Sequence, residues 1–130
     1  MASKSLNLAS EFVVLGPDHA ATPVAFTPTM FEELDGQFGG FEDHLLVSSF
    51  EFDADWPTWE IHPAGDEIVM LLSGEATLVL ETENGVEAAT LSNPGTYLIV
   101  PKGTWHTAHI STPTRMLFIT PGEGTENRDV

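Results

Sequence analysis

Hydrophobic and polar residues alternate with a period of two along most of this chain, which is typical of β-strands with one buried face. The alternating runs are short and are bounded by glycine, proline, asparagine or aspartate, the residues that favour turns. Asn84-Gly85 separates two runs and is typical of a tight hairpin, while Pro23 confines its own run to a sheet edge. The pattern predicts strands at Glu11–Leu15, Thr22–Phe26, His44–Asp53, Trp59–His62, Glu67–Leu72, Ala76–Glu81, Val86–Leu91, Tyr97–Val100, Trp105–Ile110 and Arg115–Thr120.

One segment departs from this period. The run Pro28–Leu34 predicts a short helix, because proline suits the first helical position and Thr27 is placed to cap it. Asp35-Gly36 follows and is expected to end the helix. Many short strands with little helix predict an all-β sandwich or barrel.

The length of 130 residues predicts one domain with a substantial core. We expect residues 1–40 to supply N-terminal strands and a short helix, either within the same domain or at a dimer interface. Residues 41–120 are expected to form the barrel. Residues 121–130 are polar, and we expect them to fray.

Composition narrows the class of protein and of partner. The chain is 42% hydrophobic and 18% charged, which is a globular composition. A formal net charge of −16 disfavours nucleic acid and anionic membranes as partners. There is no cysteine, which excludes disulfides and thiolate metal sites. The chain has neither a run of roughly 18 apolar residues nor a signal-peptide pattern near its start, so we expect a cytoplasmic protein.

Four side chains are candidate metal ligands: Glu60, His62, Glu67 and His106. Glu60 and His62 lie two positions apart, so on one strand they share a face. Gly65 allows a sharp turn that returns Glu67 to the same side, and His106 arrives on a distant strand. Carboxylate oxygen and imidazole nitrogen suit Zn, Fe(II), Mn or Ni.

The spacing of these residues resembles that of the cupin superfamily. The first motif of that family runs Gly-x5-His-x-His-x3–4-Glu-x6-Gly, and the second runs Gly-x5-Pro-x-Gly-x2-His-x3-Asn. The chain matches them at His62-x4-Glu67-x6-Gly74 and Gly95-x5-Pro101-x-Gly103-x2-His106. The resemblance implies a small single-domain cupin: an all-β, jelly-roll-like antiparallel β-barrel with a short N-terminal extension.

The chain departs from the family pattern at two positions. Glu60 stands where the family has its first histidine, and Ile110 stands where the second motif ends in asparagine. The implied site therefore has two histidines and two glutamates. A second carboxylate favours a harder divalent ion. The alternative is a cupin without metal, in which Glu60 and Glu67 repel one another and one takes a proton.

The resemblance implies a metal-binding enzyme that acts on a small organic molecule by dioxygenase, isomerase or lyase-type chemistry. Its cofactor would be a divalent ion: Mn, Fe, Ni or Zn. The alternatives are a small-ligand binding or sensing protein without turnover, with or without metal, and a structural cupin with an empty barrel. One fold hosts many activities, so the fold does not choose among these. The resemblance also implies a homodimer, with the strands before Phe41 at its interface.

The remaining aromatic and histidine residues have simpler interpretations. We expect His109 to be a surface residue, because it does not share the face of His106. Trp56, Trp59 and Trp105 are expected to pack in the core or an interface rather than to line a ligand pocket, and Tyr97 is expected to lie in the core.

Overall fold

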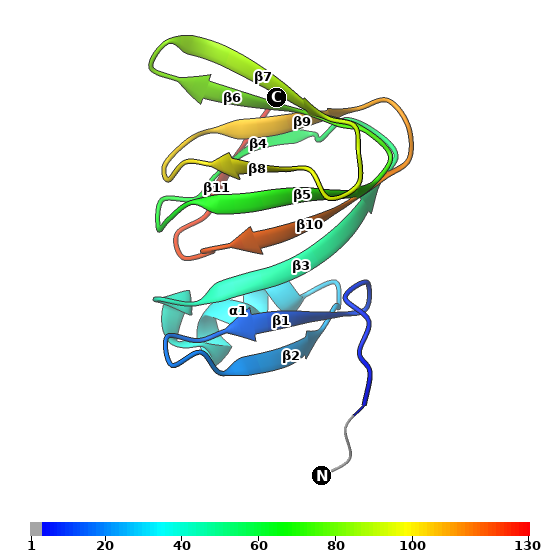
Figure 1. Ribbon diagram of the computed structural model, residues 1–130. Helices are drawn as coiled ribbons and strands as arrows, with labels where there is room; N and C mark the ends of the chain where they lie inside the picture. The colour runs from blue at the N-terminus through cyan, green and yellow to red at the C-terminus, as the bar shows by residue number, and fades with distance from the viewer. Residues whose placement is uncertain (1–3) are drawn as a thin grey trace.

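The computed structural model describes residues 4–130, which form two antiparallel β-sheets and one short α-helix (Figure 1). The larger sheet has the strand order β2-β1-β3-β10-β5-β8, and the smaller has the order β11-β4-β9-β6-β7. The elements are β1 (Glu11–Leu15), β2 (Ala21–Ala25), α1 (Met30–Gln37), a 3₁₀ turn (Gly39–Phe41), β3 (Leu45–Phe52), β4 (Thr58–Ile61), β5 (Glu67–Ser73), β6 (Ala76–Thr82), β7 (Gly85–Leu91), β8 (Tyr97–Val100), β9 (His106–Ile110), β10 (Thr114–Thr120) and β11 (Glu126–Asp129). This architecture confirms the predicted all-β, jelly-roll-like fold.

All the predicted strands are present, but the helix is displaced along the chain. It begins at Met30 and continues through Gly36 to Gln37. Thr29, not Thr27, is the N-cap residue, and its hydroxyl donates to Glu33 Oε1 at 3.1 Å instead of capping a backbone N–H. Within residues 4–130, no helix combines the length and the hydrophobicity needed to cross a bilayer.

The expectation that residues 121–130 fray is wrong for most of this segment. Strand β11 pairs with β4 in an antiparallel register that joins Asn127 to Glu60 and Arg128 to Trp59. The Arg128 guanidinium lies 5.3 Å from the ring centre of Trp59 and 4.5 Å from that of Trp105. Backbone pairing at an otherwise free strand edge and these cation–π contacts hold the segment in place, although its side chains are exposed.

Two hydrophobic clusters support the sheets. The main cluster lies between them and is drawn from β5, β6, β9 and β10, with Val69, Leu71, Leu78, Ala108 and Met116 among its members. The second lies between α1 and the N-terminal strands and contains Phe12, Val14, Met30, Leu34, Phe41 and Leu46. Phe50 packs against both clusters. The N-terminal strands therefore extend the larger sheet and share packing with the rest of the fold, as Figure 1 shows.

The turn between β5 and β6 depends on Gly74, the last residue of the first motif. Its φ is +85°, a conformation that side chains rarely adopt. A Cβ at this position would lie 2.4 Å from the Pro113 carbonyl oxygen and 2.5 Å from Thr114 Oγ1. The same Thr114 hydroxyl donates to the Glu75 carbonyl at 2.9 Å. The glycine therefore lets the β5–β6 turn pack directly on the start of β10.

Candidate metal centre

The strand pattern brings the candidate ligands to one place. Glu60 is in β4, His62 follows directly after that strand, Glu67 opens β5 and His106 opens β9. In the smaller sheet Glu60 is directly opposite His106. The turn after His62 is tied to the turn before His106, because Gly103 N–H donates to the His62 carbonyl at 3.1 Å. The two motifs are thus held together through their loops as well as through the sheet.

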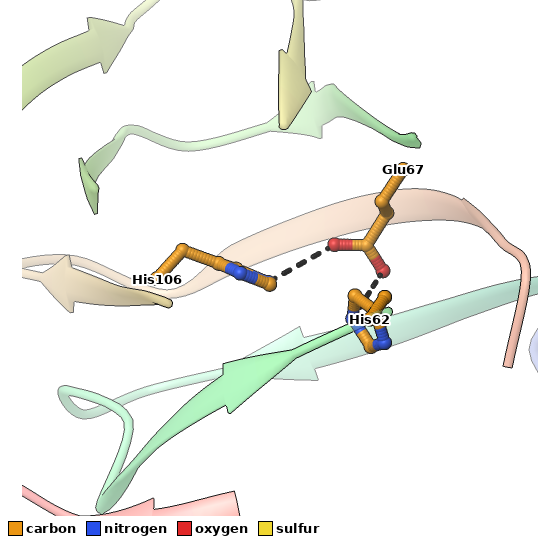
Figure 2. A group of neighbouring side chains, drawn as sticks. All are labelled: His62, Glu67 and His106. Carbon is orange, nitrogen blue, oxygen red and sulfur yellow. Dashed lines mark ion pairs between the residues drawn. The ribbon is translucent and has the colours of Figure 1, made fainter. Parts of the chain in front are cut away.

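Three of the four predicted ligands form a buried cluster: His62, Glu67 and His106 (Figure 2). One potential ligand atom from each lies within 4.8 Å of the others. Glu67 Oε1 is 3.1 Å from His106 Nε2, and Glu67 Oε2 is 3.3 Å from His62 Nε2. Three side chains from separate elements therefore point toward a common centre.

The atoms at this centre are close but are not aligned for hydrogen bonds with one another. His62 Nε2, Glu67 Oε1 and His106 Nε2 are all buried without a hydrogen-bond partner. Buried polar atoms without partners are rare, because each loses its interaction with water. Three such atoms of metal-ligating type at one point fit a divalent cation held between them.

Both histidines are fixed in the tautomer that suits metal binding. Thr125 Oγ1 donates to the Gly122 carbonyl at 2.9 Å, so it accepts from His62 Nδ1–H, which is 2.8 Å away. The Thr104 carbonyl can only accept, and it lies 3.0 Å from His106 Nδ1. With Nδ1 carrying the proton in each ring, the Nε2 lone pair of the neutral imidazole is left for a ligand.

Glu67 is held as a carboxylate. The Thr120 hydroxyl donates to its Oε2 at 2.6 Å. Burial opposes the charge, but the two histidines outweigh that cost and hold the pKa of Glu67 at about 2. For His106, burial likewise opposes the charged form, but pairing with Glu67 outweighs it and raises the pKa of the imidazole. Ionised Glu67 and the charged form of His106 therefore stabilise one another.

Glu60, the fourth predicted ligand, lies beside the cluster rather than in it. Its Oε1 is 3.9 Å from His62 Nε2, and its side chain is 32% exposed. Burial, and then the negative charge of Glu67, raise the pKa of Glu60 above its ordinary value. The carboxylate faces the same cavity as the cluster. Coordination by Glu60 stays a prediction.

These pKa shifts predict opposite pH trends for the metal-free and metal-bound forms. The lowered pKa of Glu67 gives stability that is present above 4.5 and is lost as pH falls toward about 2. The raised pKa of His106 gives stability that is present below 6.5 and is lost as pH rises through the folded value. We expect the melting temperature of the metal-free protein to be highest between these limits.

Metal binding requires neutral His106, so the rise in melting temperature on adding Zn²⁺ should be larger at pH 8 than at pH 6. Differential scanning fluorimetry with and without Zn²⁺ measures both trends, and a larger rise at pH 6 would contradict the assignment.

A cavity of about 840 Å³ leads to the cluster, with His62, Glu67 and Glu60 among its lining residues. Trp56 packs in the main cluster, as predicted, and it also lines the cavity. The indole is only 8% exposed, its ring centre is 6.1 Å from that of His106, and its Nε1 is buried without a hydrogen-bond partner. The sequence gives no sign of this role, because Trp56 lies outside both motifs, in the loop between β3 and β4.

Two other expectations have clear outcomes. His109 is exposed on β9, as predicted, and its Nδ1 is 3.2 Å from Asp55 Oδ2. The expectation that Tyr97 lies in the core is wrong, because its side chain is 58% exposed. Tyr97 is in β8, a sheet edge strand where Ile99 is also exposed, so alternation alone assigned the wrong face.

Sequence comparison agrees with this geometry. The family model described as Cupin domain matches residues 49–120, more than half of the chain. The protein belongs to the cupin family. A search of curated proteins found no match. The residues that match the family motifs, His62, Glu67 and His106, are the three that the structure brings together, and Glu60 stands in the sequence where the family has its first histidine.

Several solved structures share the cupin fold. An oxalate oxidase is 20% identical, with a TM-score of 0.53, and the match covers 62% of this chain and 44% of that one. The hydroquinone 1,2-dioxygenase of Sphingomonas sp. TTNP3 is 17% identical (TM-score 0.50, 58% of each chain). An oxalate decarboxylase mutant of Bacillus subtilis is 14% identical (TM-score 0.53, 66% of this chain and 24% of that one). The chain thus spans less than half the length of the oxalate oxidase, and identities this low establish the fold alone.

Proposed function

We propose that this cupin is a metal-dependent enzyme that acts on a small organic molecule, and that dioxygenase chemistry is the first activity to test. The observation that carries the proposal is the convergence of three orphaned ligand atoms, on His62, Glu67 and His106, at a cavity of about 840 Å³. Two histidines and one carboxylate are the donor set of many non-haem Fe(II) oxygenases. Isomerase and lyase-type chemistry with Mn, Ni or Zn are the alternatives within this proposal.

The residues divide into binding and proton-handling roles. His62 and His106 would hold the ion through Nε2, and Glu67 through its carboxylate, while Thr125 and the Thr104 carbonyl keep the rings in place. A bound ion would supply Lewis acidity and, if it is iron, redox chemistry. Glu60, with its raised pKa and its position on the cavity wall, is placed either to complete the coordination or to accept a proton from a substrate hydroxyl.

The deciding experiment is elemental analysis of protein purified without a metal-binding tag. We expect about one divalent ion per chain. Protein loaded anaerobically with Fe(II) should then consume O₂ when a substrate is present, as measured with an oxygen electrode. Absence of metal after purification, together with no binding on titration with Fe(II), Mn²⁺, Ni²⁺ and Zn²⁺, would overturn the proposal.

The role of Glu60 is separable by two substitutions. Glu60→Gln keeps the shape and removes the charge, so a ligand role predicts roughly tenfold weaker metal binding and a shift toward softer ions. Glu60→His should restore the family's three-histidine site and keep the metal. Titration of Mn²⁺, Fe(II), Ni²⁺ and Zn²⁺ into the parent and both variants measures the effect. Equal affinities in all three proteins would place Glu60 outside the coordination shell.

A second candidate is a metal-free protein that binds a small ligand without turnover. The specific observation in its favour is that ionised Glu67, 3.1 Å from His106 Nε2, favours the charged form of His106, so a proton could balance the buried carboxylate without a metal. This candidate predicts that chelators leave the melting temperature unchanged. The orphaned Nε2 and Oε1 atoms weigh against it.

We also propose that the protein forms a homodimer through its N-terminal strands. Light scattering at micromolar concentration should then report twice the chain mass of 14.1 kDa. Deleting β1 is not a clean test, because Phe12 and Val14 belong to the second hydrophobic cluster. Thr22→Lys and Pro23→Lys on the outer strand β2 are better variants, because both positions are exposed, and dimers that persist in both would place the interface elsewhere.

A further inference from the structure

The cavity above the cluster is lined by several acidic residues and, within residues 4–130, by no lysine or arginine. Its lining includes six carboxylates: Asp35, Glu51, Asp53, Asp55, Glu60 and Glu67. Among the cavity-lining residues in the described chain, none is lysine or arginine. Arg115 offsets Glu51 from outside, with its guanidinium nitrogen 2.8 Å from the carboxylate. Asp35, Asp53 and Asp55 are exposed at the mouth, where water screens their repulsion of an anion, whereas Glu60 and Glu67 lie deeper, where repulsion is stronger.

The walls of the same cavity are aromatic. Phe50 and Phe52 of β3 meet Phe118 of β10, with ring centres 6.0 and 6.1 Å apart. Trp56 lies 5.5 Å from Phe52, and Phe31 of α1 stacks on Phe50 at 6.2 Å. Phe31 is itself half exposed, so the helix supplies one side of the cavity mouth. Flat rings gain more from such walls than aliphatic molecules do.

Trp56 adds one uncompensated hydrogen-bond donor. Its Nε1–H is buried without an acceptor, and its indole lines the cavity. A buried donor left without a partner costs about 1–3 kcal/mol. Nε1 is closed to water in the free protein, so a ligand oxygen would recover that cost by accepting from it after the side chains that cover it shift. A divalent ion coordinated by Glu60 and Glu67 would bring the net charge at the base of the cavity to about zero. An anion would then find no net positive charge there to attract it.

We infer that the cavity selects uncharged or cationic aromatic molecules with a hydrogen-bond acceptor for Trp56, and that it rejects carboxylates. This inference names the ligand class for the proposed function, and it rests on the proposal that this cavity receives the substrate. The inference distinguishes this protein from a cupin that binds small dicarboxylates. Such anions have no ring to stack on the aromatic walls, and the described cavity lining offers them no lysine or arginine.

Three nearly isosteric probes test the inference: benzamide, which is neutral, benzamidinium, which is cationic, and benzoate, which is anionic. Isothermal titration calorimetry at pH 7 should give dissociation constants for benzamide and benzamidinium at least tenfold lower than that for benzoate. Measurement on chelator-treated and on Zn²⁺-loaded protein keeps the result independent of metal content and turnover, so the proposed function can fail while this inference stands. Benzoate binding within threefold of benzamide in chelator-treated protein, or no binding of any probe, would overturn the inference.

Charge variants isolate the cause of the selectivity. Asp35→Asn combined with Asp53→Asn should tighten benzoate binding at least threefold and leave benzamide unchanged. Glu83→Gln combined with Glu87→Gln removes the same charge from the β6–β7 hairpin, outside the cavity, and should change neither. Equal effects of the two pairs would show that only net charge matters and would overturn selection by the cavity.

Aromatic variants test the walls and the donor. Phe31→Ala should weaken benzamide about threefold to tenfold, since it removes an exposed stacking surface without touching the core. Tyr97→Ala, an equally exposed aromatic outside the cavity, is its control. Trp56→Phe should weaken benzamide, whose carbonyl accepts a hydrogen bond, but not benzamidinium, which has no acceptor. Equal loss for both probes would assign Trp56 a packing role alone and overturn the donor assignment.

Discussion

Replacing both His62 and His106 by alanine should abolish binding of divalent metal, from about one ion per chain to none. Each substitution removes one of the three convergent ligand atoms, and Glu67 alone cannot hold an ion against water. The rise in melting temperature that metal produces should vanish with it, because an ion bound only to the native state stabilises by about 2.7 kcal/mol at 100 times its dissociation constant. Elemental analysis and scanning fluorimetry measure the two effects.

The matched control is the pair His19→Ala and His109→Ala, which removes two exposed histidines away from the cluster. This control should keep its metal. His106→Gln alone provides a milder change if the double variant folds poorly, since glutamine retains bulk and polarity. Unchanged stoichiometry in the double variant would place the metal elsewhere or show that binding is adventitious.

Gly74→Ala should be the most destabilising conservative change in the motifs. Positive φ costs roughly 1–2 kcal/mol for alanine, and a Cβ 2.4 Å from the Pro113 carbonyl forces the backbone apart, which adds roughly 1–3 kcal/mol. We therefore expect a loss of about 2–5 kcal/mol in the free energy of unfolding, measured by urea denaturation. The displaced turn also ends β5, the strand that carries Glu67, so metal affinity should fall as well.

Gly103→Ala is the control for conformational strain alone. Its φ is +70°, but nothing lies within 4 Å of a Cβ built there. We expect a loss of only about 1–2 kcal/mol. If the two variants are equally destabilised, the close approach of Pro113 and Thr114 contributes nothing, and the motif glycine serves backbone conformation only.

The fold was predictable from sequence because its two determinants are local. Period-two alternation indicates strands, and turn residues such as Asn84-Gly85 delimit them, so β1 to β10 could be located without tertiary information. Strand β11 was not predictable in this way. Its sequence, Glu126–Asp129, is polar at every position, and only pairing with β4 and the stacking of Arg128 on Trp59 make it a strand.

The part of the candidate site that the two motifs contain was predictable from sequence. His62, Glu67 and His106 have fixed positions relative to the turns that deliver them, so their convergence follows from the two motifs. The place of Glu60 depends on finer geometry, because His62 lies just beyond the end of β4 and the two side chains no longer share strict alternation. The cavity role of Trp56 depends on how a loop folds over the sheet, which no periodicity encodes.

The hydrogen bond between Thr125 and His62 joins the candidate metal centre to the residue directly before β11. We therefore expect detachment of β11 from β4 to weaken the hold on the His62 ring, which would link metal retention to the docking of this strand. This coupling can be followed by fluorescence, because the Arg128 guanidinium of β11 packs against the indoles of Trp59 and Trp105. Intrinsic fluorescence of those two indoles would register detachment of the strand as the ion leaves.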